Sequence, residues 1–114
     1  MTQAQPLPTQ GTITARDGEW LPGERPGELV RALVDDPAGY RTMVMKIAAG
    51  PLGELHAHDE IEQIYVLEGD FFDDGASYLA GDLVVRMPGT MHRAGSRNGA
   101  TLLIAYTPYV RAAS

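Results

Sequence analysis

The 114-residue chain contains no cysteine, and this absence excludes disulfide bonds, thiolate zinc sites and cysteine nucleophiles. A cysteine-free sequence is typical of a reducing compartment, so we predict a cytoplasmic protein. The first ten residues lack both a basic start and an apolar run, and they do not resemble a secretion signal. No apolar stretch approaches the roughly 20 residues that a membrane-spanning helix requires. We therefore expect no membrane partner.

Positive charge is also scarce. The chain has 9 lysines and arginines against 15 acidic residues, and its formal net charge is -6. The basic residues are scattered from Arg16 to Arg111 rather than gathered in one patch. Because such a chain repels phosphate groups, nucleic acid is not an expected partner. The hydrophobic content of 44% suffices for the core of one domain, which we expect over residues 12–114 after a flexible arm at residues 1–11.

Long helical periodicity is missing as well. Short β-prone runs instead alternate with Gly, Pro, Asn and Asp at intervals of about 8–12 residues, the spacing of an antiparallel sandwich or barrel. The predicted fold is therefore all-β, with strands at residues 12–16, 29–34, 40–48, 54–58, 63–68, 71–73, 77–79, 83–87, 92–94 and 101–106. Three tight turns that contain Asp-Pro, Asp-Gly or Asn-Gly should each close a hairpin, at residues 36–39, 74–75 and 98–99.

The chain has three histidines, and two of them, His56 and His58, are one residue apart in an expected strand. The two-residue period of a strand puts both imidazoles on one face. Glu62 follows four residues later, and His92 opens another expected strand after a turn. Three imidazoles and one carboxylate that converge suit a divalent first-row metal ion, because imidazole binds such ions and the carboxylate offsets part of their charge.

Two neighbours of Glu62 are alternative oxygen ligands. Glu60 would share the face of His58 and Glu62 if the strand were unbroken. Gln63 offers an amide oxygen, which binds a cation less strongly than a carboxylate does. The residues alone leave the choice of oxygen ligand open.

This segment resembles the first motif of the cupin family, G-x5-H-x-H-x3-4-E-x6-G. The fixed positions of the motif are matched, in order, by Gly50, His56, His58, Glu62 and Gly69. The resemblance implies that Glu62 rather than Glu60 is the ligand. Glu60 is then a solvated carboxylate in a bend at Asp59-Glu60 that returns the chain to the site.

A second cupin motif, G-x5-P-x-G-x2-H-x3-N, is similar to the segment that contains His92. Gly81, Gly89 and His92 keep its spacing, whereas Pro88 is displaced by one residue and Ser96 stands where the motif has Asn. These departures affect turn positions and leave the implied ligands unchanged. Within the cupins, the chain is most similar to the ChrR-like group, which includes an anti-sigma factor domain and ketone-cleaving dioxygenases. The runs that carry this likeness include EWLPG, RTMVMKIAAG and RMPGTMHRAGS.

The resemblance implies the cupin double-stranded β-helix, an antiparallel jelly-roll barrel, with one divalent ion per chain held by His56, His58, Glu62 and His92. Four protein ligands leave about two positions open on a six-coordinate ion. The implied activity is that of a non-haem dioxygenase for a small diketone or hydroxyketone, with Glu62 as catalytic residue and Fe(II) favoured over Zn, Mn or Ni. A metal-supported sensor domain and a redox-neutral sugar isomerase or lyase use the same scaffold and are the alternatives.

Strand alternation suggests which side chains line a substrate pocket. In residues 41–48 it directs Lys46 to solvent and Met43, Met45 and Ile47 inward. The candidates for the pocket, chosen on this ground or because they lie close to the motif strands, are Met43, Met45, Tyr65, Met87 and Tyr106.

The opposite face of the sheet predicts self-association. Alternation leaves Val44, either Ile64 or Tyr65, and Leu103 partly exposed there, and a small sandwich has open sheet edges. We therefore expect a homodimer, in which residues 12–16 form the strand best placed to join a neighbour's sheet.

Overall fold

Every regular element of the described chain is a β-strand. A computed structural model describes residues 4–16, 18–52, 58–73 and 75–109. The strands are β1 (Leu21–Pro22), β2 (Leu29–Asp35), β3 (Arg41–Ile47), β4 (Gly50–Pro51), β5 (Ile61–Asp73), β6 (Ala76–Leu79), β7 (Leu83–Arg86), β8 (Gly95–Ser96) and β9 (Ala100–Thr107). These strands pair antiparallel throughout, which confirms the predicted fold class. In the part of the chain described, no helix is long and apolar enough to span a membrane.

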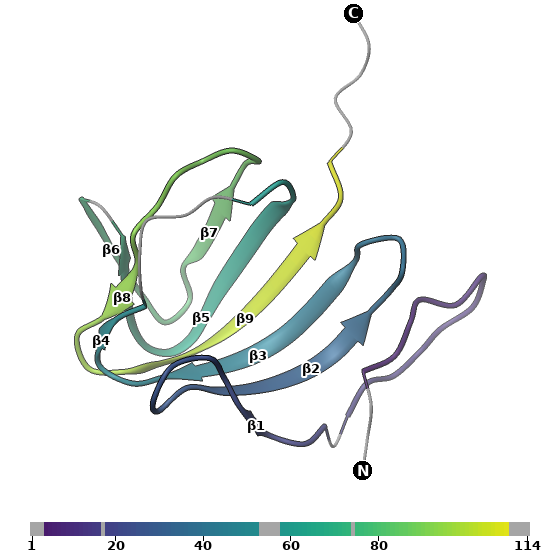
Figure 1. Ribbon diagram of the computed structural model, residues 1–114, viewed down its shortest axis with the longest axis horizontal. Coiled ribbons are helices and arrows are strands. Elements are labelled where there is room, and N and C mark those ends of the chain that lie inside the picture. The colour runs from purple at the N-terminus through teal and green to yellow at the C-terminus, as the bar shows by residue number, and fades with distance from the viewer. Residues whose placement is uncertain (1–3, 17, 53–57, 74, 110–114) are drawn as a thin grey trace, which may run out of the picture.

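The strands form one strongly curved sheet in the order β1-β2-β3-β9-β5-β8-β4, with β6 and β7 also paired to β5 (Figure 1). The long strand β5 has different pairing partners along its two halves. Its first half pairs with β9 and β7, and its second half pairs with β6 and β8. A register shift between Val66 and Glu68 separates the two halves, and such an irregularity bends a strand. The two strands expected at residues 63–68 and 71–73 are therefore one continuous strand.

The hydrophobic core lies on the inner face of the curved sheet. Alternate residues of β5 and β9 point into it, and the fully buried side chains include Val66, Phe71 and Leu102. In β3 the predicted alternation is confirmed, because Ile47 is buried, Met43 and Met45 pack against the core, and Lys46 is exposed. Burial on the inner face is the main contribution to stability that the sheet can make.

Several predicted strands are absent or displaced. Residues 12–16 form no strand, and Gln5 instead makes a bridge to Val34 of β2. The expected strand at residues 92–94 begins only at Gly95, the first residue of β8. The expected strand at residues 54–58 lies outside the described residues except for His58, which is not in a strand.

Two of the three predicted hairpins are confirmed, since β2 pairs with β3 and β5 pairs with β6. The third is wrong. The turn at residues 98–99 connects β8 to β9, but within the described residues β8 pairs with β4 and β5, whereas β9 pairs with β3 and β5. The turn therefore carries the chain from β8, which pairs with β5 at Phe72, to the start of β9, which pairs with β5 at Gly69, instead of joining strands that pair with each other.

Asp70 of β5 fixes this crossing turn. Its carboxylate accepts the main-chain N–H of Arg97 at 2.6 Å and the side-chain amide of Asn98 at 2.8 Å. Ser96 Oγ donates to the Asp70 carbonyl at 2.6 Å and accepts the N–H of Gly99 at 2.8 Å. The Arg97 N–H holds the pKa of Asp70 below its usual value, because it stabilises the charged carboxylate. Ser96, which stands where the motif has Asn, is thus a structural residue of the turn.

Two motif glycines are required for different physical reasons. Gly69 has a φ of 80°, and a side chain there would overlap the carbonyl oxygen of Gly99. Gly81 has a φ of 96°, but a Cβ at that position would have no heavy atom within 4 Å. Gly69 therefore needs both the backbone conformation and the space, and Gly81 needs only the conformation.

These two glycines provide a matched test of the fold. Gly81→Ala should lower the free energy of unfolding by about 1 kcal/mol, the cost of a left-handed backbone for a residue with a Cβ. Gly69→Ala should lower it by roughly 3 kcal/mol, because the β5 and β9 backbones must also move apart. Urea unfolding of both variants measures the difference, and equal losses would contradict the close approach at Gly69.

Candidate metal centre

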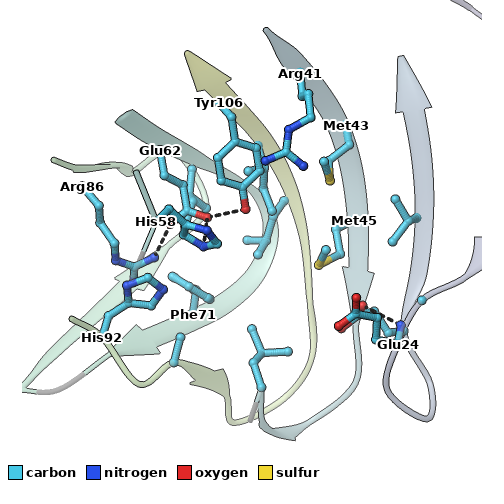
Figure 2. Close-up of a pocket in the computed structure, with 18 of the residues that line it drawn as sticks. Glu24, Arg41, Met43, Met45, His58, Glu62, Phe71, Arg86, His92 and Tyr106 are labelled. Atoms are coloured by element: carbon cyan, nitrogen blue, oxygen red, sulfur yellow. Dashed lines mark hydrogen bonds and ion pairs between the residues drawn. The ribbon is translucent and has the colours of Figure 1, made fainter. Parts of the chain in front are cut away.

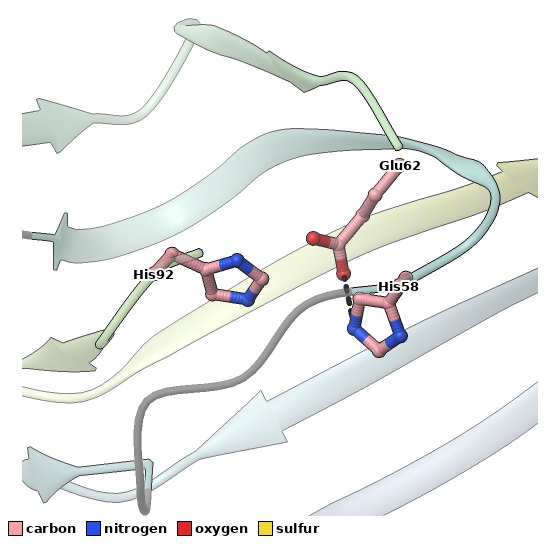
Figure 3. Close-up of side chains that lie close together, drawn as sticks. All are labelled: His58, Glu62 and His92. Carbon is pink, nitrogen blue, oxygen red and sulfur yellow. Dashed lines mark ion pairs between the residues drawn. The ribbon is translucent and has the colours of Figure 1, made fainter. Parts of the chain in front are cut away.

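His58, Glu62 and His92 lie together at one end of the curved sheet (Figure 3). One potential ligand atom from each residue lies within 4.8 Å of the other two. Glu62 is in β5 and His58 lies just before it, whereas His92 lies between β7 and β8. The structure thus brings together three of the four predicted ligands, and the fourth, His56, lies outside the described residues.

Main-chain hydrogen bonds connect the two segments that carry the histidines. The N–H of Gly89 donates to the carbonyl of His58 at 2.9 Å, and the N–H of Thr90 donates to the carbonyl of Met87 at 3.1 Å. His92 Nδ1 lies 3.3 Å from the carbonyl oxygen of Thr90, which can only accept, so a hydrogen bond here requires the proton on Nδ1. A hydrogen bond of this kind orients a histidine for metal binding.

Glu62 and Glu60 have different surroundings, although both were possible oxygen ligands. The chain bends at Asp59 and Glu60, as expected, and the Glu60 carboxylate forms an ion pair with Arg41 at 2.8 Å. It is therefore not the merely solvated group that we predicted. Glu62 Oε2 lies 4.0 Å from His58 Nε2 and its side chain is 6% exposed. Gln63 follows Glu62 in the strand and so points to the other face.

Glu62 is the middle residue of a row that crosses three strands. In the register of the sheet it is opposite Arg86 of β7 and opposite Tyr106 of β9. Arg86 donates to Glu62 Oε1 at 3.0 Å, and the hydroxyl of Tyr106 donates to Glu62 Oε2 at 2.7 Å. Burial, and then the negative charge of Glu62, raise the pKa of Tyr106, so its hydroxyl remains a donor at neutral pH.

Arg86 contacts a second carboxylate from the far half of β5. Its other terminal nitrogen donates to Asp73 Oδ2 at 2.9 Å, and the hydroxyl of Tyr78 also donates to the Asp73 carboxylate. The side chains of Arg86 and Asp73 are 7% and 15% exposed. No sequence motif marks this network, although alternation within β7 places Arg86 on the same face as the buried Val84.

A cavity of about 810 Å³ opens beside these residues (Figure 2). Its polar end contains His58, Glu62, Arg86, His92 and Tyr106, and its walls include Met43, Met45, Leu102 and Ile104. Three of the predicted pocket residues, Met43, Met45 and Tyr106, therefore line it. Tyr65 and Met87 do not.

The placement of Tyr65 and Met87 has a local reason in each case. In β5, Ile64 and Val66 take the inner positions, so the alternation directs Tyr65 outward, where it is 39% exposed. Met87 follows the last residue of β7 at the turn closed by Thr90, and it is 46% exposed. Proximity to a motif strand in sequence did not determine which face either side chain occupies.

The donor set fits a divalent first-row metal ion. Two imidazoles and a carboxylate within one cluster are ligands that Fe, Zn, Mn and Ni accept in proteins. Arg86 partly neutralises the Glu62 carboxylate, which reduces the negative charge of the cluster. The nearby cavity has room for a small molecule beside the ligands.

The curved antiparallel sheet with histidines and a glutamate at one end is the arrangement of a cupin. Over residues 9–110 the sequence matches the ChrR cupin-like domain family, and the chain belongs to that family. This confirms the resemblance drawn from the motifs. No curated protein matches the sequence.

Solved structures support the same fold. An RmlC-like cupin protein from Ralstonia eutropha JMP134 is 18% identical, with a TM-score of 0.74 over 88% of this chain and 69% of that one. The anti-sigma factor ChrR in complex with SigE from Rhodobacter sphaeroides is 21% identical, with a TM-score of 0.66 over 80% of this chain and 49% of that one. An Fe(II) form of HppE is 18% identical, with a TM-score of 0.72 over 89% of this chain and 62% of that one.

The cluster predicts one divalent metal ion per chain. His58→Ala and His92→Ala should each remove most of the bound metal, because each deletes an imidazole that the remaining donors cannot replace. Metal content is measured by elemental analysis after dialysis, with the parent protein as reference. Affinity should also fall at acidic pH, because protonated imidazole rings do not coordinate a metal ion. Parental metal content in His92→Ala would contradict the assignment.

Proposed function

We propose that this protein is a metal-dependent, non-haem dioxygenase that cleaves a small diketone or hydroxyketone in the cytoplasm. The observation that carries the proposal is the position of His58, Glu62 and His92 at one end of a cavity whose lining includes the apolar side chains of Met43, Met45, Leu102 and Ile104. His58, Glu62 and His92 would hold the ion with His56 as the fourth ligand, and four protein ligands would leave two positions of a six-coordinate ion open. We favour Fe(II) as the ion. When bound, it would act as a Lewis acid that holds an enolised substrate next to oxygen.

The protein's own groups in this proposal hold the substrate and move its proton. Glu62 Oε2 is the oxygen nearer to His58, and with a β-diketone it would accept the proton of the carbon between the two carbonyl carbons, which leaves the enolate. The Tyr106 hydroxyl, which already donates to that oxygen at 2.7 Å, keeps the carboxylate oriented. Both atoms of O₂ enter the products of the cleaved carbon–carbon bond, so one molecule of O₂ is consumed per molecule of substrate.

Part of the cavity is suited to the apolar part of such a substrate. Met43 and Met45 of β3 are opposite Ile104 and Leu102 of β9 in the register, and the four side chains line the same wall. Thioether side chains adapt to irregular shapes, so this wall accommodates alkyl or aryl substituents. Exclusion of water by these side chains strengthens the electrostatic interactions at the polar end.

A sensor or binding domain without turnover is the second candidate. It is favoured by the family match and by the likeness to ChrR, an anti-sigma factor solved in complex with SigE. In that role the cavity would bind a small molecule, and no product would form. Oxygen consumption distinguishes the two functions.

The test is an oxygen-electrode screen of diketones and aryl ketones with the Fe(II)-loaded protein. We expect Glu62→Gln to keep part of the metal, because the histidines remain, and to lose most of the oxygen uptake. Glu60→Gln is the matched control, since it changes a neighbouring carboxylate that pairs with Arg41, and it should retain both. Conversion of a substrate without oxygen uptake would instead indicate an isomerase or lyase, and binding without conversion would indicate a sensor.

We also propose that the protein is a homodimer that associates through the outer face of the sheet. Val44, Leu103, Tyr65 and Leu83 are consecutive partners in the register across β3, β9, β5 and β7. Leu83 and Tyr65 are 55% and 39% exposed. An apolar row of this kind on a sheet face is typical of an interface.

Light scattering measures the expected dimer directly, as a mass about twice the 12.3 kDa of the chain. Leu83→Asp should shift the protein to monomer, because it puts a charge at the most exposed position of the apolar row. Leu79→Asp is the control, since Leu79 is 65% exposed but lies in β6, away from that row. A parent protein that is monomeric at micromolar concentration would overturn the proposal.

A further inference from the structure

Arg86 is a buried cation in direct contact with the proposed acidic metal ligand. Its guanidinium bridges Glu62 at 3.0 Å and Asp73 at 2.9 Å, with one terminal nitrogen on each carboxylate. The side chains of Arg86 and Glu62 are 7% and 6% exposed, so water screens their interaction little. A divalent ion bound to Glu62 would therefore meet a positive charge a few ångströms away.

The two carboxylate oxygens of Glu62 nevertheless have different neighbours. Oε1 accepts from Arg86, whereas Oε2 faces His58 and Tyr106. Two carboxylates and one guanidinium leave a net charge of one unit negative, with Asp73 and Glu62 negative and Arg86 positive. Glu62 can therefore bind a metal ion while Arg86 remains paired with Asp73.

We infer that Arg86 competes with the metal ion for Glu62, and that Asp73 holds the guanidinium once the metal is bound. Without metal, Arg86 neutralises a carboxylate that burial would otherwise strongly disfavour in its charged form. With metal, Asp73 prevents Arg86 from becoming an unpaired buried charge. Arg86 and Asp73 are then positioning residues that set the metal affinity through Glu62. This inference depends on the metal site of the proposed function.

The inference predicts opposite effects for the two partners. Arg86→Gln should raise the affinity for Co(II) at least about tenfold, because it removes a unit charge beside the ligand in a poorly screened site. Asp73→Asn should lower the affinity about tenfold, because Arg86 then has Glu62 as its only charged partner in the network. A general loss of structural order would instead lower the affinity in both variants.

The double variant separates this mechanism from a direct attraction between Asp73 and the metal ion. If Asp73 acts through Arg86, adding Asp73→Asn to Arg86→Gln should change the Co(II) affinity by less than about twofold. If Asp73 attracts the ion directly, the loss should persist without Arg86. Arg25→Gln is the control for overall charge, since Arg25 lines the same cavity and also pairs with a buried glutamate, Glu28.

Co(II) affinity is measured by competition with a chelator, and circular dichroism reports folding. If Arg86→Gln does not fold, the lower affinity of Asp73→Asn and the unchanged affinity of Arg25→Gln still test the inference. Equal Co(II) affinity in the parent, Arg86→Gln and Asp73→Asn would overturn the inference and leave the metal site standing. Failure of the parent to bind Co(II) would overturn the metal site and the inference together.

Discussion

The antiparallel pairing of β5 with a neighbour on each side determines where the chemistry of this protein lies. Because β7 and β9 both pair with the first half of β5, the positions opposite Glu62 are taken by Arg86 and Tyr106. Cross-strand neighbours share a face, so the three polar side chains meet on the inner face of the sheet, beside its hydrophobic core. A shift of either register by one residue would turn its partner to the outer face and leave Glu62 buried with one fewer hydrogen bond.

The bend in β5 brings a second carboxylate, Asp73, to Arg86. After the register shift beyond Val66, the same strand continues into the pairing with β6 and β8, and it presents Asp73 to the guanidinium of Arg86. Both carboxylates that contact Arg86 thus come from one strand. Burial of three charged groups is tolerated because each has a charged or hydrogen-bonding partner within reach.

The sequence was sufficient for the class of fold, through strand alternation, and for the proximity of His58, Glu62 and His92, through the resemblance to the two cupin motifs. Alternation in β3 predicted the inward side of Met43 and Met45, and motif spacing brought Glu62 and His92 together. It was not sufficient for the partner of each strand, since the turn after Ser96 could close a hairpin or cross to another strand. The Arg86 network depends on that pairing, because it joins side chains that are distant in sequence, and no local pattern marks it.

The hydrogen bond from the Gly89 N–H to the His58 carbonyl has a consequence for how the site can diversify. It joins the two histidine-bearing segments through backbone atoms alone, so the side chains around it are not needed to hold the donors in place. Met87, Thr90 and Met91 on one side and Asp59 on the other are all exposed. Substitutions at these exposed positions should therefore leave the histidine and glutamate donors in place.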